Sequence, residues 1–242
     1  MAVENVGNEK RAAVESMFDS IAWRYDFLNH FLSFGTDRLW RRRAVRMIGK
    51  HIKPSTILDV ATGTGDLALA ALKLGPSKIT GIDISEKMLS IGREKIRKKC
   101  AEGKIELLKG DSENIQFPDS HFDAVMVAFG VRNFSNPLSG LIEMYRVTKP
   151  GGMLMVLEFS KPLSFPFRQV YNFYFINILP FFGRMFSKDK NAYRYLPDSV
   201  MKFPDNENFL ALLSEAGFSS PVQKKLSGGI ASIYTGIKPS AQ

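Results

Sequence analysis

Cysteine and histidine are scarce in this sequence. Its 242 residues include one cysteine, Cys100, and three histidines. A single cysteine excludes an internal disulfide and suits a reducing compartment such as the cytoplasm. The histidines are scattered, and neither they nor Cys100 follow a metal-ligand spacing. The sequence therefore predicts no bound metal.

Long apolar runs are also missing. No stretch reaches the roughly eighteen apolar residues of a membrane-spanning helix. Residues 1–16, MAVENVGNEKRAAVES, lack the apolar segment of a secretory signal. We therefore expect a cytoplasmic protein. Its net charge of +9 suggests an anionic partner, either nucleic acid or a lipid surface, although a basic surface without a partner explains the charge equally well.

The most informative stretch is ILDVATGTGD, residues 57–66. An apolar, strand-forming run breaks into a glycine turn, and helix-forming residues follow. Gly63 and Gly65 let the backbone turn tightly and approach a ligand, and the free N–H groups of a helix beginning near Thr64 point towards that ligand. A second predicted strand, residues 78–84, contains Asp83 near its end, where the carboxylate can accept from two ribose hydroxyls. This order predicts a nucleotide-cofactor site.

Asp59 distinguishes between two cofactors. Gly63-x-Gly65-x-x-Ala68 followed by an acidic residue also fits a dinucleotide fingerprint. Asp59, however, lies at the end of the first strand, four residues before Gly63. A carboxylate there would repel a pyrophosphate and attract the ammonium and sulfonium of S-adenosylmethionine. We therefore expect S-adenosylmethionine as the cofactor, with Asp59 among its contacts.

Polar side chains also follow the next two predicted strands. The strand at residues 104–109 leads to Asp111, and the strand at residues 122–129 leads to Arg132 and Asn133. Ligands of open α/β sheets bind at the carboxyl ends of the strands. We expect Asp111 to accept a hydrogen bond from an adenine amino group, and Arg132 and Asn133 to face the same edge.

Helical segments precede and follow this core. Residues 1–10 are expected to be disordered, and residues 17–32 and 37–48 to be helices within a substrate-binding region of about residues 14–50. The second helix carries Arg38, Arg41, Arg42, Arg43 and Arg46, for which we expect a solvated or membrane-facing surface. Residues 160–204 are rich in aromatic and basic residues and predict a helical lid. The tail predicts a helix at residues 206–216 and a hairpin of residues 221–226 and 230–237, forming an antiparallel edge.

Seven motifs together resemble one family. They are RYDFLNHFLSFGTDRLWRR, DVATGTGDLA, GDSENIQFPDSHFD, FGVRNF, MYRVTKPGG, LEFSKP and YRYLPDSVMKFPD, and they extend over most of the chain. The sequence is similar to the UbiE/MenG C-methyltransferases of menaquinone and ubiquinone synthesis. DxxxGxG and KPGG occur in many methyltransferases, whereas FGVRNF, LEFSKP and YRYLPDSVMKFP in this order are much more specific.

The resemblance implies a fold, a reaction and a set of site residues. The fold is that of class I S-adenosylmethionine-dependent methyltransferases, a seven-stranded, mostly parallel sheet with helices on both faces, here one domain of residues 1–242 with a lid insertion. Ala128 replaces a serine often found at the end of strand four in the family. The family's methyl-donor contacts correspond to Thr64, Asp83, Asp111 and Ser112. Its positions near the quinol correspond to Tyr25, Arg132 and Asn133.

The implied reaction is methylation of a ring carbon of a polyprenylated quinol, with demethylmenaquinol as the preferred reading. A benzoquinol substrate, the tail length, the proton acceptor and the oligomeric state stay open, and a homodimer is compatible with the sequence. Arg132 is expected to stabilise a quinol anion, or alternatively to form a salt bridge with Asp111 or Glu158. The arginine-rich helix suggests transient contact with the inner face of a membrane.

Two other functional classes compete with this interpretation. The positive charge favours an RNA methyltransferase, but the sequence has no base-stacking nucleophile motif and no added RNA-binding module. We therefore expect no nucleic acid partner. A non-catalytic cofactor-binding subunit is disfavoured by the intact glycine loop and the motif after strand four.

Overall fold

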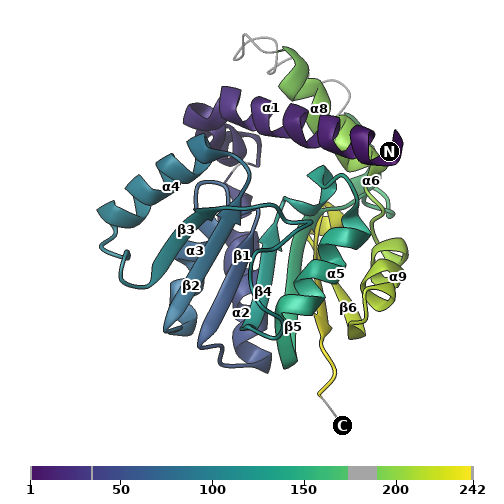
Figure 1. Cartoon of the computed structure of the whole chain (residues 1–242). Coiled ribbons are helices and arrows are strands. Elements are labelled where there is room, and N and C mark those ends of the chain that lie inside the picture. The colour runs from purple at the N-terminus through teal and green to yellow at the C-terminus, as the bar shows by residue number, and fades with distance from the viewer. Residues whose placement is uncertain (1, 34, 174–189, 241–242) are drawn as a thin grey trace.

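The computed structural model of this chain describes residues 2–33, 35–173 and 190–240 (Figure 1). Its helices and strands are α1 (Ala2–Leu32), α2 (Thr36–His51), β1 (Thr56–Val60), α3 (Asp66–Ala71), η1 (Leu72–Leu74), β2 (Lys78–Asp83), α4 (Glu86–Lys98), β3 (Ile105–Lys109), β4 (Phe122–Ala128), η2 (Val131–Asn133), α5 (Pro137–Val147), β5 (Thr148–Phe159), α6 (Phe167–Phe173), α8 (Lys190–Lys202), α9 (Glu207–Glu215), β6 (Ser219–Leu226), η4 (Ser227–Gly229) and β7 (Ala231–Ile237).

The strands form one seven-stranded sheet in the order β3-β2-β1-β4-β5-β7-β6. The pairs from β3 to β5 are parallel, and β7 is antiparallel to both β5 and β6. The predicted tail hairpin is confirmed, with one difference. The antiparallel strand is β7, one position in from the edge, because the hairpin pairs with β5 through its second strand. The strand order reverses between β1 and β4, the point where open α/β sheets form a ligand crevice.

Two apolar cores cover the two faces of the sheet. Alternate residues of each strand point to opposite faces, so Ile57 enters one core while Leu58 enters the other. Helices α2, α3 and α4 contribute to the first core, and α5 and α9 contribute to the second. The predicted arrangement of helices on both faces of a mostly parallel sheet is confirmed.

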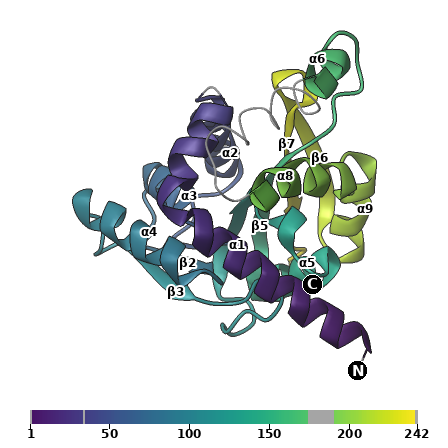
Figure 2. The ribbon, with the colours of Figure 1, turned by 90° about the horizontal axis from the view of Figure 1, so that it is seen from above.

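The first helix differs from its prediction. It begins at Ala2, so the expectation that residues 1–10 are disordered is wrong. The helix crosses the carboxyl ends of the strands, as the view from above shows (Figure 2). Polar contacts of Arg11 and Asp19 join it to the segments that follow β2 and β3. Within the stretch whose composition predicts disorder, Lys10 Nζ donates to Phe134 O at 2.5 Å.

The predicted lid is only partly within the described residues. Its described portions include the helices α6 and α8, and α8 contacts η2 at the carboxyl end of β4. Residues 174–189 lie outside the described part. Over the ranges that are described, no helix is long and apolar enough to cross a membrane.

Candidate functional site

The glycine loop after β1 has the backbone geometry that its sequence predicts. Gly63 and Gly65 have φ angles of 57° and 78°, in the left-handed region that favours glycine. Gly65 caps α3, so this helix begins at Asp66, slightly later than the sequence suggests. A Cβ at Gly63 would meet no heavy atom within 4 Å. The loop therefore leaves open space next to its backbone.

Asp83 is fixed beside this loop by two backbone donors. Gly63 N donates to Asp83 Oδ2 at 2.8 Å, and Ser85 N donates to Oδ1 at 2.9 Å. Burial raises the pKa of Asp83 to about 6, although the two backbone hydrogen bonds oppose this shift. Each carboxylate oxygen retains a lone pair for a further donor. Asp83 is thus held as an acceptor at the edge of the cavity described below.

Asp59 lies deeper, beneath the same loop. Its side chain is buried, and Thr62 Oγ1 donates to Oδ2 at 2.7 Å. Within the described part of the chain, Asp59 Oδ1 has no hydrogen-bond partner. Burial raises the pKa of Asp59 to about 7. Asp59 does not itself line the cavity, so its predicted contact with a cofactor ammonium stays a prediction.

Arg41 belongs to the same buried region, which corrects its predicted place on the surface. Its Nη1 lies 2.5 Å from Asp37 Oδ2 and 3.6 Å from Asp66 Oδ2, and its side chain is only 9% exposed. The positive charge of Arg41 also opposes the rise in the Asp59 pKa. The other arginines of α2, namely Arg38, Arg42, Arg43 and Arg46, are exposed.

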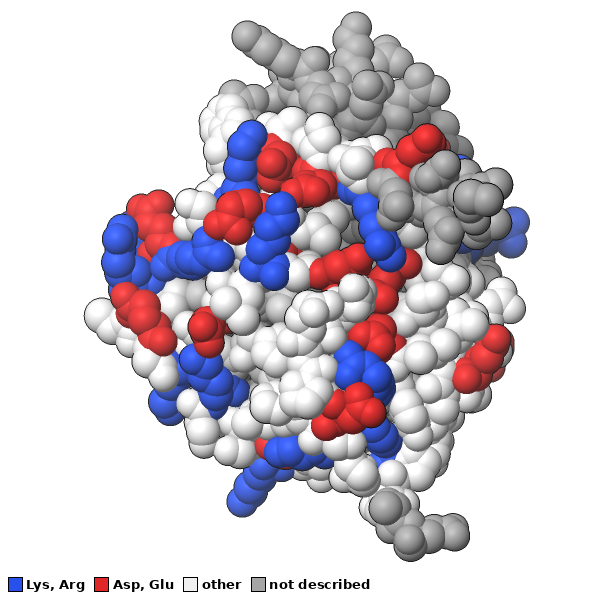
Figure 3. All heavy atoms as spheres, in the orientation of Figure 1, with Lys and Arg blue, Asp and Glu red and all other residues white. Residues whose placement is uncertain are grey.

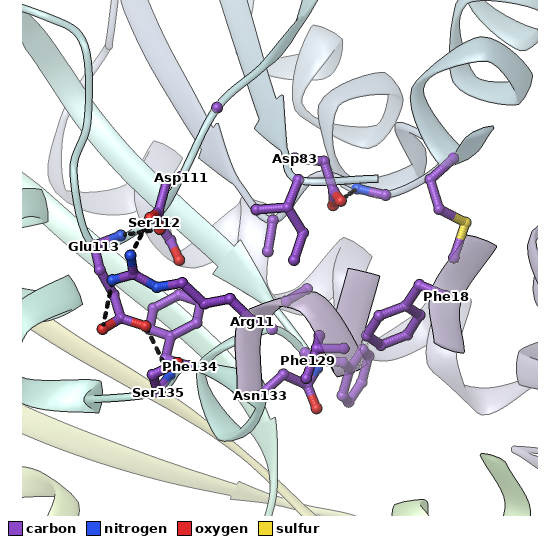
Figure 4. A pocket seen from close by; sticks show the side chains of 18 residues that line it. Arg11, Phe18, Asp83, Asp111, Ser112, Glu113, Phe129, Asn133, Phe134 and Ser135 are labelled. Carbon is purple, nitrogen blue, oxygen red and sulfur yellow. Dashed lines mark hydrogen bonds and ion pairs between the residues drawn. The ribbon is translucent and has the colours of Figure 1, made fainter. Parts of the chain in front are cut away.

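One cavity lies between α1 and the carboxyl ends of the strands (Figure 4). Its lining includes Gly63 after β1, Asp83 at the end of β2, Asp111 and Ser112 after β3, and Asn133 after β4. The structure therefore brings together five of the predicted site residues. The remaining lining residues are Arg11, Val14, Phe18, Ala61, Ile84, Met88, Gly110, Glu113, Ala128, Phe129, Gly130, Phe134 and Ser135.

Helix α1 supplies a wall of this cavity. The sequence predicted a substrate-binding region from about residue 14, which includes Val14 and Phe18, and missed Arg11. Arg11, Val14 and Phe18 follow the three- and four-residue spacing of one helix face and all line the cavity. The three-residue step from Arg11 to Val14 was a usable signal for Arg11, which lies just before the predicted start of the substrate-binding region. Figure 4 shows Arg11 reaching across the cavity towards Asp111, with Phe18 and Phe129 at the opposite end.

Asp111 is oriented from two sides. Glu113 N donates to Asp111 Oδ1 at 2.8 Å, and Arg11 Nη1 lies 2.9 Å from Oδ2. Arg11 Nη2 also lies 3.2 Å from Glu113 Oε2. Glu113 in turn accepts from Ser135 N at 2.6 Å, which joins the loop after β3 to the segment before α5.

Arg132 is paired rather than free. Its Nη1 donates to Glu158 Oε1 at 2.8 Å and to Phe129 O at 2.5 Å, and its side chain is 7% exposed. Of the two salt-bridge alternatives, Glu158 is the partner. Burial raises the pKa of Glu158, whereas the Arg132 charge lowers it. Arg132 does not line the cavity.

Asn133 is better placed for a ligand than Arg132. It lines the cavity, and its Nδ2 donates to Phe129 O at 3.4 Å. Its Oδ1 is buried and has no hydrogen-bond partner in the described ranges. Phe129 has a positive φ of 58°, an uncommon conformation that turns its carbonyl towards both Asn133 and Arg132.

Two predicted site residues have other placements. The Thr64 hydroxyl donates to Asp26 Oδ1 of α1 at 2.6 Å and accepts from Lys95, so it does not line the cavity. The Tyr25 side chain lies outside the described part of the structure. Across the described residues, no group of three or more histidine, cysteine, aspartate or glutamate side chains is arranged to hold a metal ion.

Comparison with known proteins adds sequence relatives. A model of the ubiE/COQ5 methyltransferase family matches residues 4–238. The demethylmenaquinone methyltransferase of Porphyromonas gingivalis is 46% identical over 231 residues, which cover 95% of this chain and 94% of the relative. The ubiquinone/menaquinone biosynthesis C-methyltransferase UbiE of Geotalea daltonii is 48% identical over 232 residues, covering 95% of this chain and 98% of the relative.

Solved structures share the fold at much lower identity. A SAM-dependent methyltransferase from Thermotoga maritima has a TM-score of 0.64 at 22% identity and covers 92% of this chain and 99% of its own. The [4+2]-cyclase SpnF has a TM-score of 0.63 at 19% identity and covers 83% and 81%. Because one of these proteins is named as a cyclase, the shared fold does not by itself define a reaction.

Proposed function

The chain belongs to the ubiE/COQ5 methyltransferase family and is a methyltransferase, and from this premise we propose that it transfers the methyl group of S-adenosylmethionine to a ring carbon of a polyprenylated quinol. Demethylmenaquinol is the proposed substrate, and a benzoquinol is the alternative. The relatives named above support both readings, because one is named for demethylmenaquinone alone and the other for both quinones.

The observation that carries the proposal is the cavity under α1. It combines the glycine loop and Asp83 with Asp111 and Ser112 at one edge of the sheet. Asp83 suits the ribose hydroxyls of the methyl donor, and Asp111 suits its adenine. The cavity continues past Ala128 to Phe129 and Asn133, where a flat acceptor ring can approach the donor.

Carbon methylation requires alignment and removal of protons. The sulfonium of the donor supplies an electrophilic methyl group. A quinol deprotonated at a hydroxyl carries negative charge on the adjacent ring carbon, which forms the new C–C bond while the C–S electron pair returns to sulfur. The ring carbon then loses its hydrogen as a proton. The task of the protein is to hold the two reactants in line and exclude water.

Asn133 is the proposed contact for the quinol hydroxyl. Its Oδ1 lacks a partner in the described part of the protein, so it can accept from the hydroxyl and orient it. Arg132 was expected to stabilise the anion, but its charge is balanced by Glu158. We assign Arg132 to positioning, because its bond to Phe129 O holds the backbone next to Asn133.

Contact with a membrane surface is part of the proposal, since the substrate is a lipid. Four arginines of α2 are exposed, and Leu163, Phe165 and Phe167 before and at the start of α6 are also exposed. Cationic side chains favour anionic lipid headgroups, while apolar side chains enter the interface. We propose that the protein is cytoplasmic and binds weakly and peripherally to the inner face of the membrane.

An RNA substrate is the competing proposal, and the charge distribution favours it less. On the face shown in Figure 3, basic and acidic side chains are interspersed. RNA binding proteins usually present a continuous basic surface with aromatic stacking positions.

The experiment that tests the reaction class is methyl transfer from labelled S-adenosylmethionine to total RNA and to a lipid extract from cells blocked in quinol methylation. Under reducing conditions, label should enter the lipid fraction and not the RNA. Label in RNA alone would overturn the proposal.

A further inference from the structure

Helix α1 contacts the segments that follow β1, β2 and β3 through a row of polar side chains, of which Arg11 also lines the cavity. Arg11 pairs with Asp111, Asp19 accepts from Ser85 Oγ at 2.6 Å, and Asp26 accepts from Thr64 Oγ1. Ser85 is the neighbour of Asp83 that donates its backbone N–H to that carboxylate. One face of α1 therefore reaches the segments after β1, β2 and β3, which carry the proposed donor contacts.

Arg11 makes the most specific of these contacts. Its guanidinium spans Asp111 and Glu113, while its Nε is buried and has no hydrogen-bond partner among the residues described. Glu113 is 6% exposed and is also held by the backbone of the segment before α5. The guanidinium thus connects α1 to a fixed carboxylate and to the carboxylate proposed to meet the adenine.

Asp111 lines the cavity and retains hydrogen-bonding capacity beyond its contacts with Arg11 and the Glu113 N–H. A carboxylate accepts about four hydrogen bonds in total. Arg11 and the Glu113 N–H each contact a different oxygen of Asp111, and together they restrict rotation of its carboxylate. Lone pairs on both oxygens stay available to a further donor. A donor group inside the cavity then meets a carboxylate whose direction is already set.

We propose that α1 is an integral wall of the methyl-donor pocket and that Arg11 is a positioning residue, which directs Asp111 towards the exocyclic amino group of the donor's adenine. This inference rests on the proposed function. It extends that function by assigning recognition of the nucleobase to a pair of residues from α1 and the loop after β3.

The test compares two ligands by calorimetry. S-adenosylhomocysteine carries the adenine amino group, and S-inosylhomocysteine carries a carbonyl oxygen in its place. The native protein should prefer the adenosyl ligand by about tenfold or more, the range expected for a charged hydrogen bond. Arg11→Met should lose most of this preference, because its affinity for the adenosyl ligand alone should fall. Arg11→Lys should retain part of the preference.

Glu15→Gln is the matched control, because Glu15 lies on α1 but pairs with the exposed Lys109. It should leave both affinities unchanged. If Arg11→Met weakens both ligands equally, or neither, the positioning role is wrong. If the native protein binds neither ligand, the proposed donor site is wrong instead, so the two failures are distinguishable.

Discussion

Asp83 carries the clearest prediction at the scale of single residues. Its carboxylate is fixed by Gly63 N and Ser85 N and faces the cavity. Asp83→Asn replaces an acceptor oxygen with an amide donor, so donor affinity should fall by at least about tenfold. Calorimetry with S-adenosylhomocysteine measures this change, and Glu106→Gln, at the exposed pair with Lys78, is the control. Equal affinities of Asp83→Asn and the control would remove Asp83 from the site.

The raised pKa values of Asp59 and Asp83 predict a pH dependence of donor binding. These values are about 7 and about 6, and the ionised carboxylates are the forms that attract an ammonium or accept from ribose hydroxyls. Donor binding should therefore release protons, and affinity should rise as the pH increases from about 5.5 to about 7.5.

Calorimetry in two buffers with different ionisation enthalpies measures the protons released on binding. Asp59→Asn should reduce the number released near pH 7. Affinity that is constant over this pH range would show that neither carboxylate changes its protonation on binding.

The buried ion pair with Asp37 makes Arg41 important for stability. Arg41→Met removes the cation that lies 2.5 Å from the buried carboxylate of Asp37, and breaking a buried pair typically costs about 3–5 kcal/mol of unfolding free energy. Arg42→Met, at the adjacent exposed position, should change stability by no more than about 0.5 kcal/mol. Urea denaturation of the two variants provides the comparison. Similar free energies of unfolding for the two variants would show that the buried ion pair of Arg41 does not stabilise the fold.

At the scale of elements, α2 carries the prediction of membrane binding. Arg42→Glu with Arg43→Glu reverses two exposed charges, and each cation near an anionic surface contributes about 1 kcal/mol. Co-sedimentation of this double variant with anionic vesicles should be weaker than that of the native protein. Co-sedimentation of the native protein should itself be weak at high salt. Arg97→Glu in the last turn of α4, combined with Lys99→Glu directly after this helix, is the charge-matched control. Binding that is equal for neutral vesicles and indifferent to salt would assign the contact to the exposed Leu163, Phe165 and Phe167 instead.

The elements also show what local sequence patterns predict and what they do not. Ser85 caps α4 through the Met88 N–H, as its position before a helix-forming run predicts. Strands β1, β2 and β4 are apolar enough to be recognised directly. In contrast, the polar face of α1 meets Asp111, Glu113 and Ser85, partners that are distant in sequence. Local composition contains no record of such contacts.

At the scale of the whole molecule, the sheet order places the predicted residues together. Gly63, Asp83, Asp111 and Asn133 each follow or end a different parallel strand, so their convergence follows from topology. The burial of Arg41 and its pairing with Asp37 do not follow from this rule. An arginine among five on one helix looks equivalent to its neighbours until the packing of α2 against the sheet is known.

The most direct test of the account is a methyl-transfer assay with defined quinols. Reduced demethylmenaquinol and the corresponding demethylated benzoquinol are presented in anionic vesicles with labelled S-adenosylmethionine, and mass spectrometry locates the new methyl group. The account predicts a ring C-methyl on reduced demethylmenaquinol, and no product from its oxidised quinone, which cannot form the attacking anion. Methylation at oxygen, or failure to methylate either reduced quinol while the donor binds, would contradict it.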